Sequence, residues 1–185
     1  MSFKLDIRKA IEASATLLRL TPHRRMDRKR LLALLYLIDR EGLKRTGRPV
    51  VGGKLTAMKH GPIHGEVYDL IKGGGKDQAS WSSHFDNQDY RVHLSSDDLR
   101  VSALSRYEID LINEISTAYA GFGTWDVADV THATGEYTKN FRSGTSTPIP
   151  FEDLVEAVGR KADTSEILKD AEQKEYFDRL FSGQA

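Results

Sequence analysis

The chain has 185 residues, contains no cysteine, and carries 27 basic residues against 27 acidic ones. This length suits one domain with a hydrophobic core, and the lack of cysteine excludes disulfides, thiol nucleophiles and thiolate metal sites. The longest apolar run, residues 31–38, is far shorter than the about 20 residues that a bilayer requires, and the charged N-terminus leaves no room for a signal peptide. We therefore expect a cytoplasmic protein without a membrane span.

The balanced charge is unevenly distributed along the chain. Residues 1–30 carry nine Lys or Arg against three Asp or Glu, a balance of +6, whereas residues 151–185 carry five against nine, a balance of −4. The neutral total provides no general attraction to nucleic acid or to anionic membranes. Opposite charge at the two ends favours polar partners.

Hydrophobic periodicity predicts two helices at the start of the chain. Apolar side chains recur at intervals of three and four over residues 4–20, which is typical of an amphipathic helix. A second helix is predicted to begin after Asp27, a suitable N-cap, and to end near Arg45, with Gly47 as the C-cap. Its apolar run is too continuous for one exposed face, so we expect it to be the central core helix.

The middle of the chain is predicted to contain the β-structure. Residues 49–59 favour an extended segment with a glycine turn, and residues 90–94 alternate as a short half-buried strand that we expect to pair with it. Between them, Pro62 is predicted to start a helix that ends at the glycines of residues 73–75. Residues 76–89 are predicted to form an exposed loop.

The second half of the chain is predicted to be helical. A capping box of Ser105 and Glu108 starts one helix, and Thr124 is a candidate cap for a shorter one. Two more helices are predicted, one over residues 151–158 and one that starts at Asp163 and carries an apolar stripe.

These elements predict a mainly α (α+β) fold. We expect a compact helical domain around the central apolar helix, with a small β-hairpin or a ribbon of two or three strands. The predicted domain covers residues 1–150. Residues 151–185 are predicted to form a C-terminal helical extension, which either packs on the domain or presents its apolar stripe to a partner.

The glycine-rich stretch over residues 47–62 does not match a phosphate-binding loop. A Walker-type loop needs lysine and then serine or threonine after its last glycine, because its amides wrap the phosphates and the hydroxyl holds magnesium. Counted from Gly47, Gly53 stands where lysine is required, and the lysine that is present, Lys54, is followed by Leu55 instead of a hydroxyl residue. We interpret the stretch as a structural turn, and we assign no cofactor.

Two histidines four residues apart, His60 and His64, suggest a zinc site, because this spacing on one helical face can share a metal ion. Pro62 lies between them and places His60 outside the predicted helix. No third ligand is apparent from the spacing, and no nucleophile motif or catalytic triad is recognisable. We assign no metal ligand and no catalytic residue, and a metal-dependent hydrolase that uses His60 and His64 stays an alternative.

Five basic residues cluster at the start of the predicted central helix: Arg24, Arg25, Arg28, Lys29 and Arg30. Positive charges at a helix N-terminus oppose its dipole by about 0.3 to 1 kcal/mol each when exposed. We interpret the cluster as a docking patch for an acidic protein surface, with a phosphate backbone as the less favoured partner. The alternative is a solvated face that Asp27 and nearby carboxylates partly neutralise.

Trp81 and Phe85 lie among polar residues in the predicted loop. Large aromatic side chains on a polar loop are typical interface anchors. They could equally fold back onto the core, since their large apolar area favours burial against the core as much as against a partner. Both interpretations stay open, and both residues are candidates for partner binding.

Several short stretches occur in a recognisable order. They are Tyr-Leu-Ile-Asp-Arg at residues 36–40, Gly-Arg-Pro-Val-Val-Gly at 47–52, the motif residues Ala57, Met58, Lys59, Gly61 and Pro62, Glu-Val-Tyr-Asp at 66–69, Trp-Asp-Val at 125–127, and Thr131 with His132. Over residues 5–140 the chain thereby resembles the Panacea domain, a family that includes SocA-like antitoxins and phage-associated GepA-like proteins. The chain has Tyr137 where the resemblance leads us to expect a tryptophan.

The resemblance implies a bacterial or phage antitoxin that neutralises a cognate toxin by direct protein–protein binding. It also implies a possible role as a proteolytic adaptor, since SocA-like members can deliver the toxin to a ClpXP-type protease. It carries over no catalytic residues, so we expect no enzyme. A DNA-binding autorepressor that acts at its own operator is a further alternative, although no helix-turn-helix signature is clear.

Overall fold

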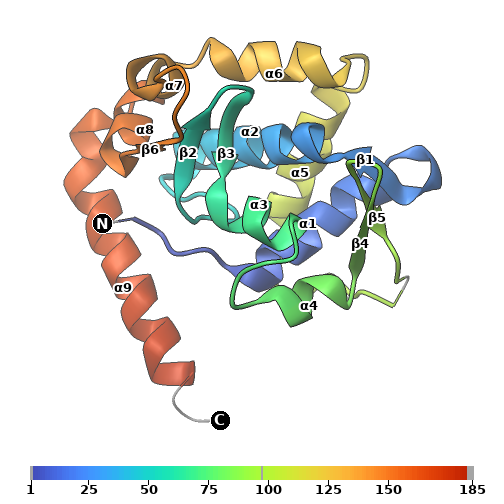
Figure 1. The fold of residues 1–185 in the computed structure, drawn as a ribbon. Helices are drawn as coiled ribbons and strands as arrows, with labels where there is room; N and C mark the ends of the chain where they lie inside the picture. Colours follow the sequence, from blue (N-terminus) through green and yellow to red (C-terminus); the bar gives the residue numbers. More distant parts are fainter. Residues whose placement is uncertain (1, 97, 183–185) are drawn as a thin grey trace.

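The computed structural model describes residues 2–96 and 98–182, so the last three residues of the predicted extension lie outside the described part (Figure 1). Its helices are α1 (Ile7–Arg19), α2 (Arg28–Thr46), α3 (Gly65–Ile71), α4 (Gln78–Ser82), α5 (Arg106–Ala118), α6 (Thr124–His132), α7 (Gly135–Asn140), α8 (Phe151–Ala157) and α9 (Thr164–Ser182), with 3-10 turns η1 (Pro22–Arg24) and η2 (Lys161–Asp163). Its strands are β1 (Arg25–Asp27), β2 (Leu55–Met58), β3 (Gly61–His64), β4 (Phe85–Gln88), β5 (Arg91–Leu94) and β6 (Thr147–Ile149). The predicted mainly α (α+β) fold is confirmed. None of the helices in the described part is long and apolar enough to cross a bilayer.

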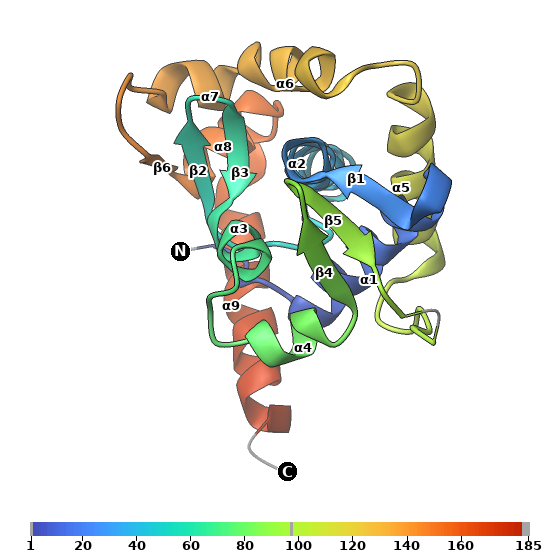
Figure 2. The ribbon, with the colours of Figure 1, turned by 45° about the vertical axis from the view of Figure 1, so that its right-hand side comes forward.

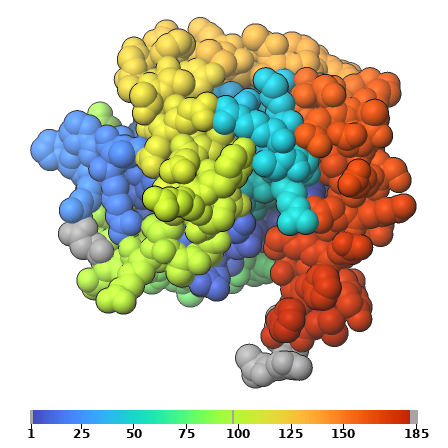
Figure 3. Space-filling model, turned by 180° about the vertical axis from the view of Figure 1, so that it is seen from behind, coloured from blue at the N-terminus to red at the C-terminus, as the bar shows by residue number. Residues whose placement is uncertain are grey.

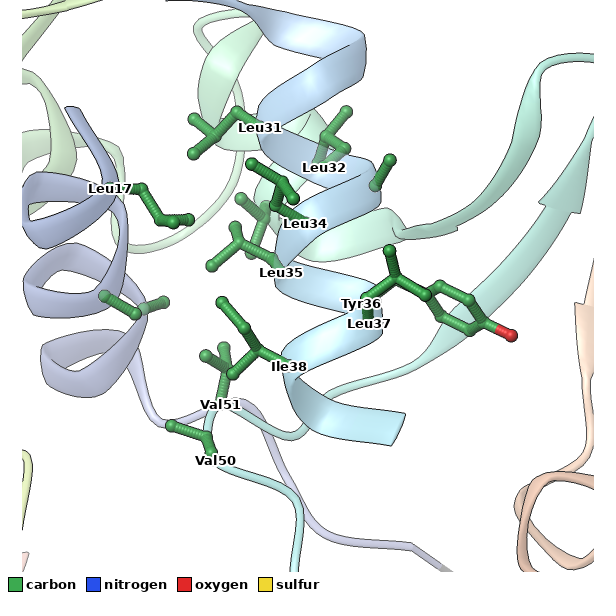
Figure 4. Packing of buried hydrophobic residues seen from close by; sticks show 14 of the residues in the cluster. Leu17, Leu31, Leu32, Leu34, Leu35, Tyr36, Leu37, Ile38, Val50 and Val51 are labelled. Carbon is green, nitrogen blue, oxygen red and sulfur yellow. The ribbon is translucent and has the colours of Figure 1, made fainter. Parts of the chain in front are cut away.

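Helix α2 is the centre of the fold, as predicted. The Asp27 carboxylate caps it by accepting from the Lys29 N–H at 2.8 Å, and Gly47 ends it with a φ of +78°. Every residue over positions 31–38 is buried. Helices α1, α5 and α6 pack against it, and Figure 4 shows Leu17 of α1 facing the leucines of α2. Each fully buried leucine contributes about 1.5 to 3 kcal/mol relative to an exposed one.

Two small antiparallel sheets flank this helix, one with strand order β1-β5-β4 and one with order β3-β2-β6. The predicted pairing of residues 90–94 with residues 49–59 is therefore wrong. β5 pairs with β1, where Met26 lies opposite Val92, and β2 pairs with β3 and β6, where Leu55 lies opposite His64 and Ile149. Alternating hydrophobicity shows which face of a strand is buried, but it does not identify the partner strand.

The helix predicted to begin at Pro62 begins three residues later. Pro62 lies in β3, opposite Ala57 of β2, and α3 starts at Gly65 after His64. β3 is an edge strand, where proline is tolerated because it need not donate to a neighbouring strand. Gly61, with a φ of +116°, lets the chain turn back along β2 before the helix forms.

Residues 76–89 form helix α4 and strand β4 rather than only an exposed loop. Trp81 and Phe85 are 0% and 2% exposed, and their ring centroids lie 4.4 Å apart. They belong to the hydrophobic core, so their interpretation as exposed partner-binding anchors is corrected. Polar neighbours in the sequence point away from the core while these two large apolar side chains point into it.

Helix α9 combines the two alternatives predicted for the C-terminal extension. Its first half packs on the body through Ile167 and Ala171, which are 4% and 2% exposed. Its last two turns present large apolar side chains to solvent: Tyr176, Phe177, Leu180 and Phe181. Figures 1 and 3 show this end of α9 extending past the rest of the molecule.

Candidate partner-binding groove

Two of the motif stretches, Gly61-Pro62 and Thr131-His132, meet at the turn between β2 and β3. A Cβ atom built on Gly61 would lie 2.6 Å from Oγ1 of Thr131 in α6. Thr131 is buried, and its hydroxyl donates to the backbone oxygen of Ala128 at 2.7 Å. The turn can approach α6 this closely because glycine has no side chain.

Tyr137 supports the same turn. Its hydroxyl donates to the backbone oxygen of Met58 at 2.9 Å, and its ring stacks on His132 with the centroids 5.0 Å apart. The residue that replaces the expected tryptophan therefore holds one end of β2 in place.

A groove of about 290 Å³ lies between this turn and the N-terminal end of α2. Its apolar lining residues are Leu32, Ala33, Met58, Pro62 and Ile63, and its basic lining residues are Arg28, Lys29, Lys59 and His60. No acidic side chain is found among the described residues that line it. The groove thus combines an apolar surface with a positively charged rim.

Exposed aromatic side chains stand beside this groove. Trp125 of α6 is 57% exposed, and its ring centroid lies 4.3 Å from Lys29 Nζ and 5.3 Å from the His60 ring centroid. Tyr90 is also exposed, with Arg28 Cζ 4.7 Å from its ring centroid. These cation–π contacts orient the basic side chains, while the aromatic rings offer apolar area to a partner.

The electrostatic potential of the groove is positive. Partial burial, followed by the charges of Lys29, Lys59 and His132, lowers the pKa of His60. The lowered pKa keeps the His60 imidazole neutral at neutral pH, so the positive charge comes from the Lys and Arg side chains. An anionic group in the groove would be attracted there and would raise the pKa of His60.

The predicted basic cluster does not act as one patch. Arg28 and Lys29 line the groove, whereas Arg24 and Arg25 are exposed in the segment that leads into α2. Arg30 donates instead to the backbone oxygens of Tyr119, at 2.7 Å, and Phe122. The Arg30 guanidinium ties α2 to the end of α5, so it has a structural role, and its part in partner binding stays a prediction.

His60 and His64 lie in different environments. His60 is exposed on the β2–β3 turn, whereas His64 is 1% exposed and lies with Nε2 3.5 Å from Asp39 Oδ2. Within the described residues, no three His, Cys, Asp or Glu side chains gather as a metal site. The shared zinc site that their spacing suggested is therefore not formed by this arrangement.

Sequence reasoning missed two buried polar groups around α2. One is Asp39 beside His64. The other is Glu136, which is fully buried, accepts from the Tyr36 hydroxyl, and pairs with Arg40 Nε at 2.9 Å. A charged residue at the end of an apolar helical run was the available signal for Asp39, but its partner could not be inferred because β3 was not recognised as a strand.

The comparisons with known proteins identify the family. The family model described as "Antitoxin SocA-like, Panacea domain" matches residues 31–137, which include α2 from Leu31 onward, the β2–β3 and β4–β5 hairpins, and α6. Of the groove residues, Arg28 and Lys29 lie just before the matched range. Neither the curated proteins nor the solved structures contain a match to the chain.

Proposed function

This chain belongs to the SocA-like Panacea-domain antitoxin family, and we propose that it neutralises a cognate toxin by direct binding through the groove between α2 and the β2–β3 turn. The observation that carries this proposal is the convergence of Arg28, Lys29, Lys59 and Trp125 around one apolar groove. Exposed aromatic and basic side chains over an apolar surface are typical of the residues that dominate binding energy at interfaces.

The partner surface that best fits this groove is an acidic toxin segment with one large apolar side chain. Carboxylates of the segment would pair with Arg28, Lys29 and Lys59, while its apolar side chain would fill the space beside Met58 and Ile63. Charge complementarity of this kind accelerates encounter and selects the partner, and burial of the apolar side chain slows dissociation.

Neutralisation would occur by occlusion. The antitoxin would cover the active or docking surface of the toxin, which requires no bond-making chemistry from this chain. We place this action in the cytoplasm of a bacterium, where a phage-associated or chromosomal toxin would act.

We also propose that the chain acts as a proteolytic adaptor, which delivers the bound toxin to a protease. Figures 1 and 2 show helix α6, beside the groove, and the free end of α9 at opposite ends of the molecule. The apolar side chains at the end of α9 would therefore stay accessible to a ClpXP-type protease while the groove holds the toxin.

The test is co-expression with the product of the neighbouring reading frame, read out as growth rescue and co-purification. The double variant Arg28→Glu/Lys29→Glu is expected to slow association by about tenfold or more. The matched control Lys76→Glu/Lys169→Glu changes the total charge equally at two exposed sites outside the groove and is expected to bind normally.

The substitutions in the groove should leave the fold intact. Acidic side chains in the first turn of α2 favour the helix dipole, which offsets the cation–π contacts that the double variant loses. Equal association rates for the two double variants would remove the groove from the interface. Growth rescue by the wild-type chain without any complex between the chain and the toxin would overturn direct binding itself.

A further inference from the structure

A second cavity, of about 220 Å³, lies on another part of the molecule and shares no lining residue with the groove. It is formed where the start of the chain, the segment after α2, strand β6 and helix α8 meet. Its apolar walls include Phe3, Leu55, Ile149, Phe151 and Leu154, and the rings of Phe3 and Phe151 pack edge to face with centroids 5.9 Å apart. Two buried titratable side chains, Asp39 and His64, also line it.

The Asp39 carboxylate is held by backbone donors. Its Oδ1 accepts from the Val51 N–H at 2.7 Å and its Oδ2 from the Gly52 N–H at 2.8 Å. Burial raises the pKa of Asp39, and the nearby His64 and these N–H groups act in the opposite direction. Burial is the larger effect, so the pKa of Asp39 lies above its usual value, while the two N–H donors fix the orientation of the carboxyl group.

His64 is polar, buried and unsatisfied. It is 1% exposed, and neither of its ring nitrogens has a hydrogen-bond partner among the described residues. The Asp39 carboxylate, 3.5 Å from Nε2, favours the tautomer with its proton on that nitrogen. Nδ1 then keeps a lone pair that can accept a hydrogen bond.

We propose that this cavity binds a small molecule with a ring-sized apolar body and a hydrogen-bond-donating head group, such as a phenol or a primary amine. The head group would donate to Nδ1 of His64, and the body would lie against Phe151 and Leu154. An engineered cavity of about 150 Å³ is enough to hold benzene, so the present volume accommodates a six-membered ring with a short substituent. A carboxylate head group has no hydrogen to donate to Nδ1, so we expect the site to disfavour it.

The cavity is also coupled to the stability of the chain. The segment that carries Phe3 is bound to the segment after α2, because the Gly53 N–H donates to the Phe3 oxygen at 3.0 Å and the Asp6 N–H donates to the Val51 oxygen at 2.9 Å. A ligand that contacts Phe3 and His64 would hold these segments together and stabilise the folded state.

The test uses the full chain with isotope-labelled histidine and four probes: phenol, benzylamine, toluene and benzoate. Phenol and benzylamine are expected to shift the His64 imidazole resonances, and at about 100 times their Kd to raise Tm by roughly 5 to 10 °C. Toluene and ionised benzoate, which both lack a hydrogen to donate to Nδ1, are expected to bind at least tenfold more weakly.

Two variants locate the binding. His64→Phe should abolish the preference for phenol over toluene, and Leu154→Trp, which fills the cavity but keeps His64, should abolish binding of all four probes. Unchanged His64 resonances with every probe on the wild-type chain would overturn the proposal and mean that only water occupies the cavity. Equal binding of phenol and toluene to the wild-type chain would also overturn it.

Discussion

At the scale of single residues, Glu12 shows how one buried carboxylate orders a loop. It is 4% exposed, and its oxygens accept from the backbone N–H groups of Ser102, Ala103 and Leu104 at 2.9 to 3.0 Å. Burial raises the pKa of Glu12, but these hydrogen bonds and the charge of Arg8 together outweigh it, so the pKa lies below its usual value. The carboxylate thereby joins α1 to the segment that starts α5.

Glu12→Gln is expected to lower the free energy of unfolding at pH 7 by about 2 to 3 kcal/mol, because a neutral amide accepts fewer and weaker hydrogen bonds. A carboxyl group whose pKa is lower in the folded state stabilises the fold at any pH above its pKa in the unfolded state. This contribution is lost as the pH falls through the folded-state pKa. The difference between variant and wild type should therefore shrink below about pH 4.3. Urea unfolding from pH 7 to pH 3 measures this, and a constant difference would contradict it.

At the scale of elements, the β2–β3 hairpin depends on Gly61, whose φ of +116° and contact with Thr131 both exclude a side chain. Gly144 makes a matched control, because it also has a positive φ, of +78°, but nothing lies within 4 Å of a Cβ atom built on it.

Gly144→Ala is expected to cost about 1 to 2 kcal/mol of stability through backbone strain alone. Gly61→Ala should cost at least about 1 kcal/mol more, because the added methyl displaces the turn from α6. It should also weaken toxin binding, since the turn forms one wall of the groove. Chemical denaturation of both variants tests this, and equal losses would show that the clash with Thr131 is relieved without cost.

Helix α9 is divided into a half that stabilises the fold and a half that does not. Ile167→Ala should lower stability by about 2 to 4 kcal/mol, because a buried side chain is lost. Deletion of residues 176–185 should change Tm by less than about 2 °C, because the apolar side chains removed are largely solvated. Thermal unfolding of the two variants measures the contrast, and a large loss on truncation would mean that the end of α9 packs on the body in solution.

At the scale of the whole molecule, the two oppositely charged ends partly neutralise each other. Lys4 Nζ lies 2.7 Å from Glu175 of α9, and Lys174 Nζ lies 3.7 Å from Asp6. Some of the charge asymmetry that suggested polar partners is therefore used within the chain. What stays available to a partner is the local positive potential of the groove on a molecule whose net charge is zero.

Association with the toxin is expected to slow as salt rises from 50 to 500 mM, by about tenfold, while dissociation changes little, because charge steers encounter and apolar burial controls lifetime. Stopped-flow measurements on wild type and on Arg28→Glu/Lys29→Glu test this. If the association rate of the double variant depends on salt as steeply as that of wild type, the charges that steer encounter lie elsewhere. Retention of operator DNA in a gel shift at physiological salt would instead support the autorepressor alternative.

The amino-acid sequence by itself determined the local features of this protein. The cap at Asp27, the end of α2 at Gly47, the capping box at Ser105 and the burial of residues 31–38 were predictable because each depends on neighbours within about four residues. The motif stretches also determined the family, since they occur in a recognisable order.

Only the tertiary structure decided which distant segments meet. The pairing of β5 with β1, the burial of Trp81, the diversion of Arg30 to backbone oxygens and the placement of Trp125 beside Lys29 all join residues far apart in the chain. A periodic pattern specifies that a side chain is buried or exposed but not what it contacts. The groove and the Asp39–His64 cavity are products of such contacts, and for that reason they became visible in the folded molecule alone.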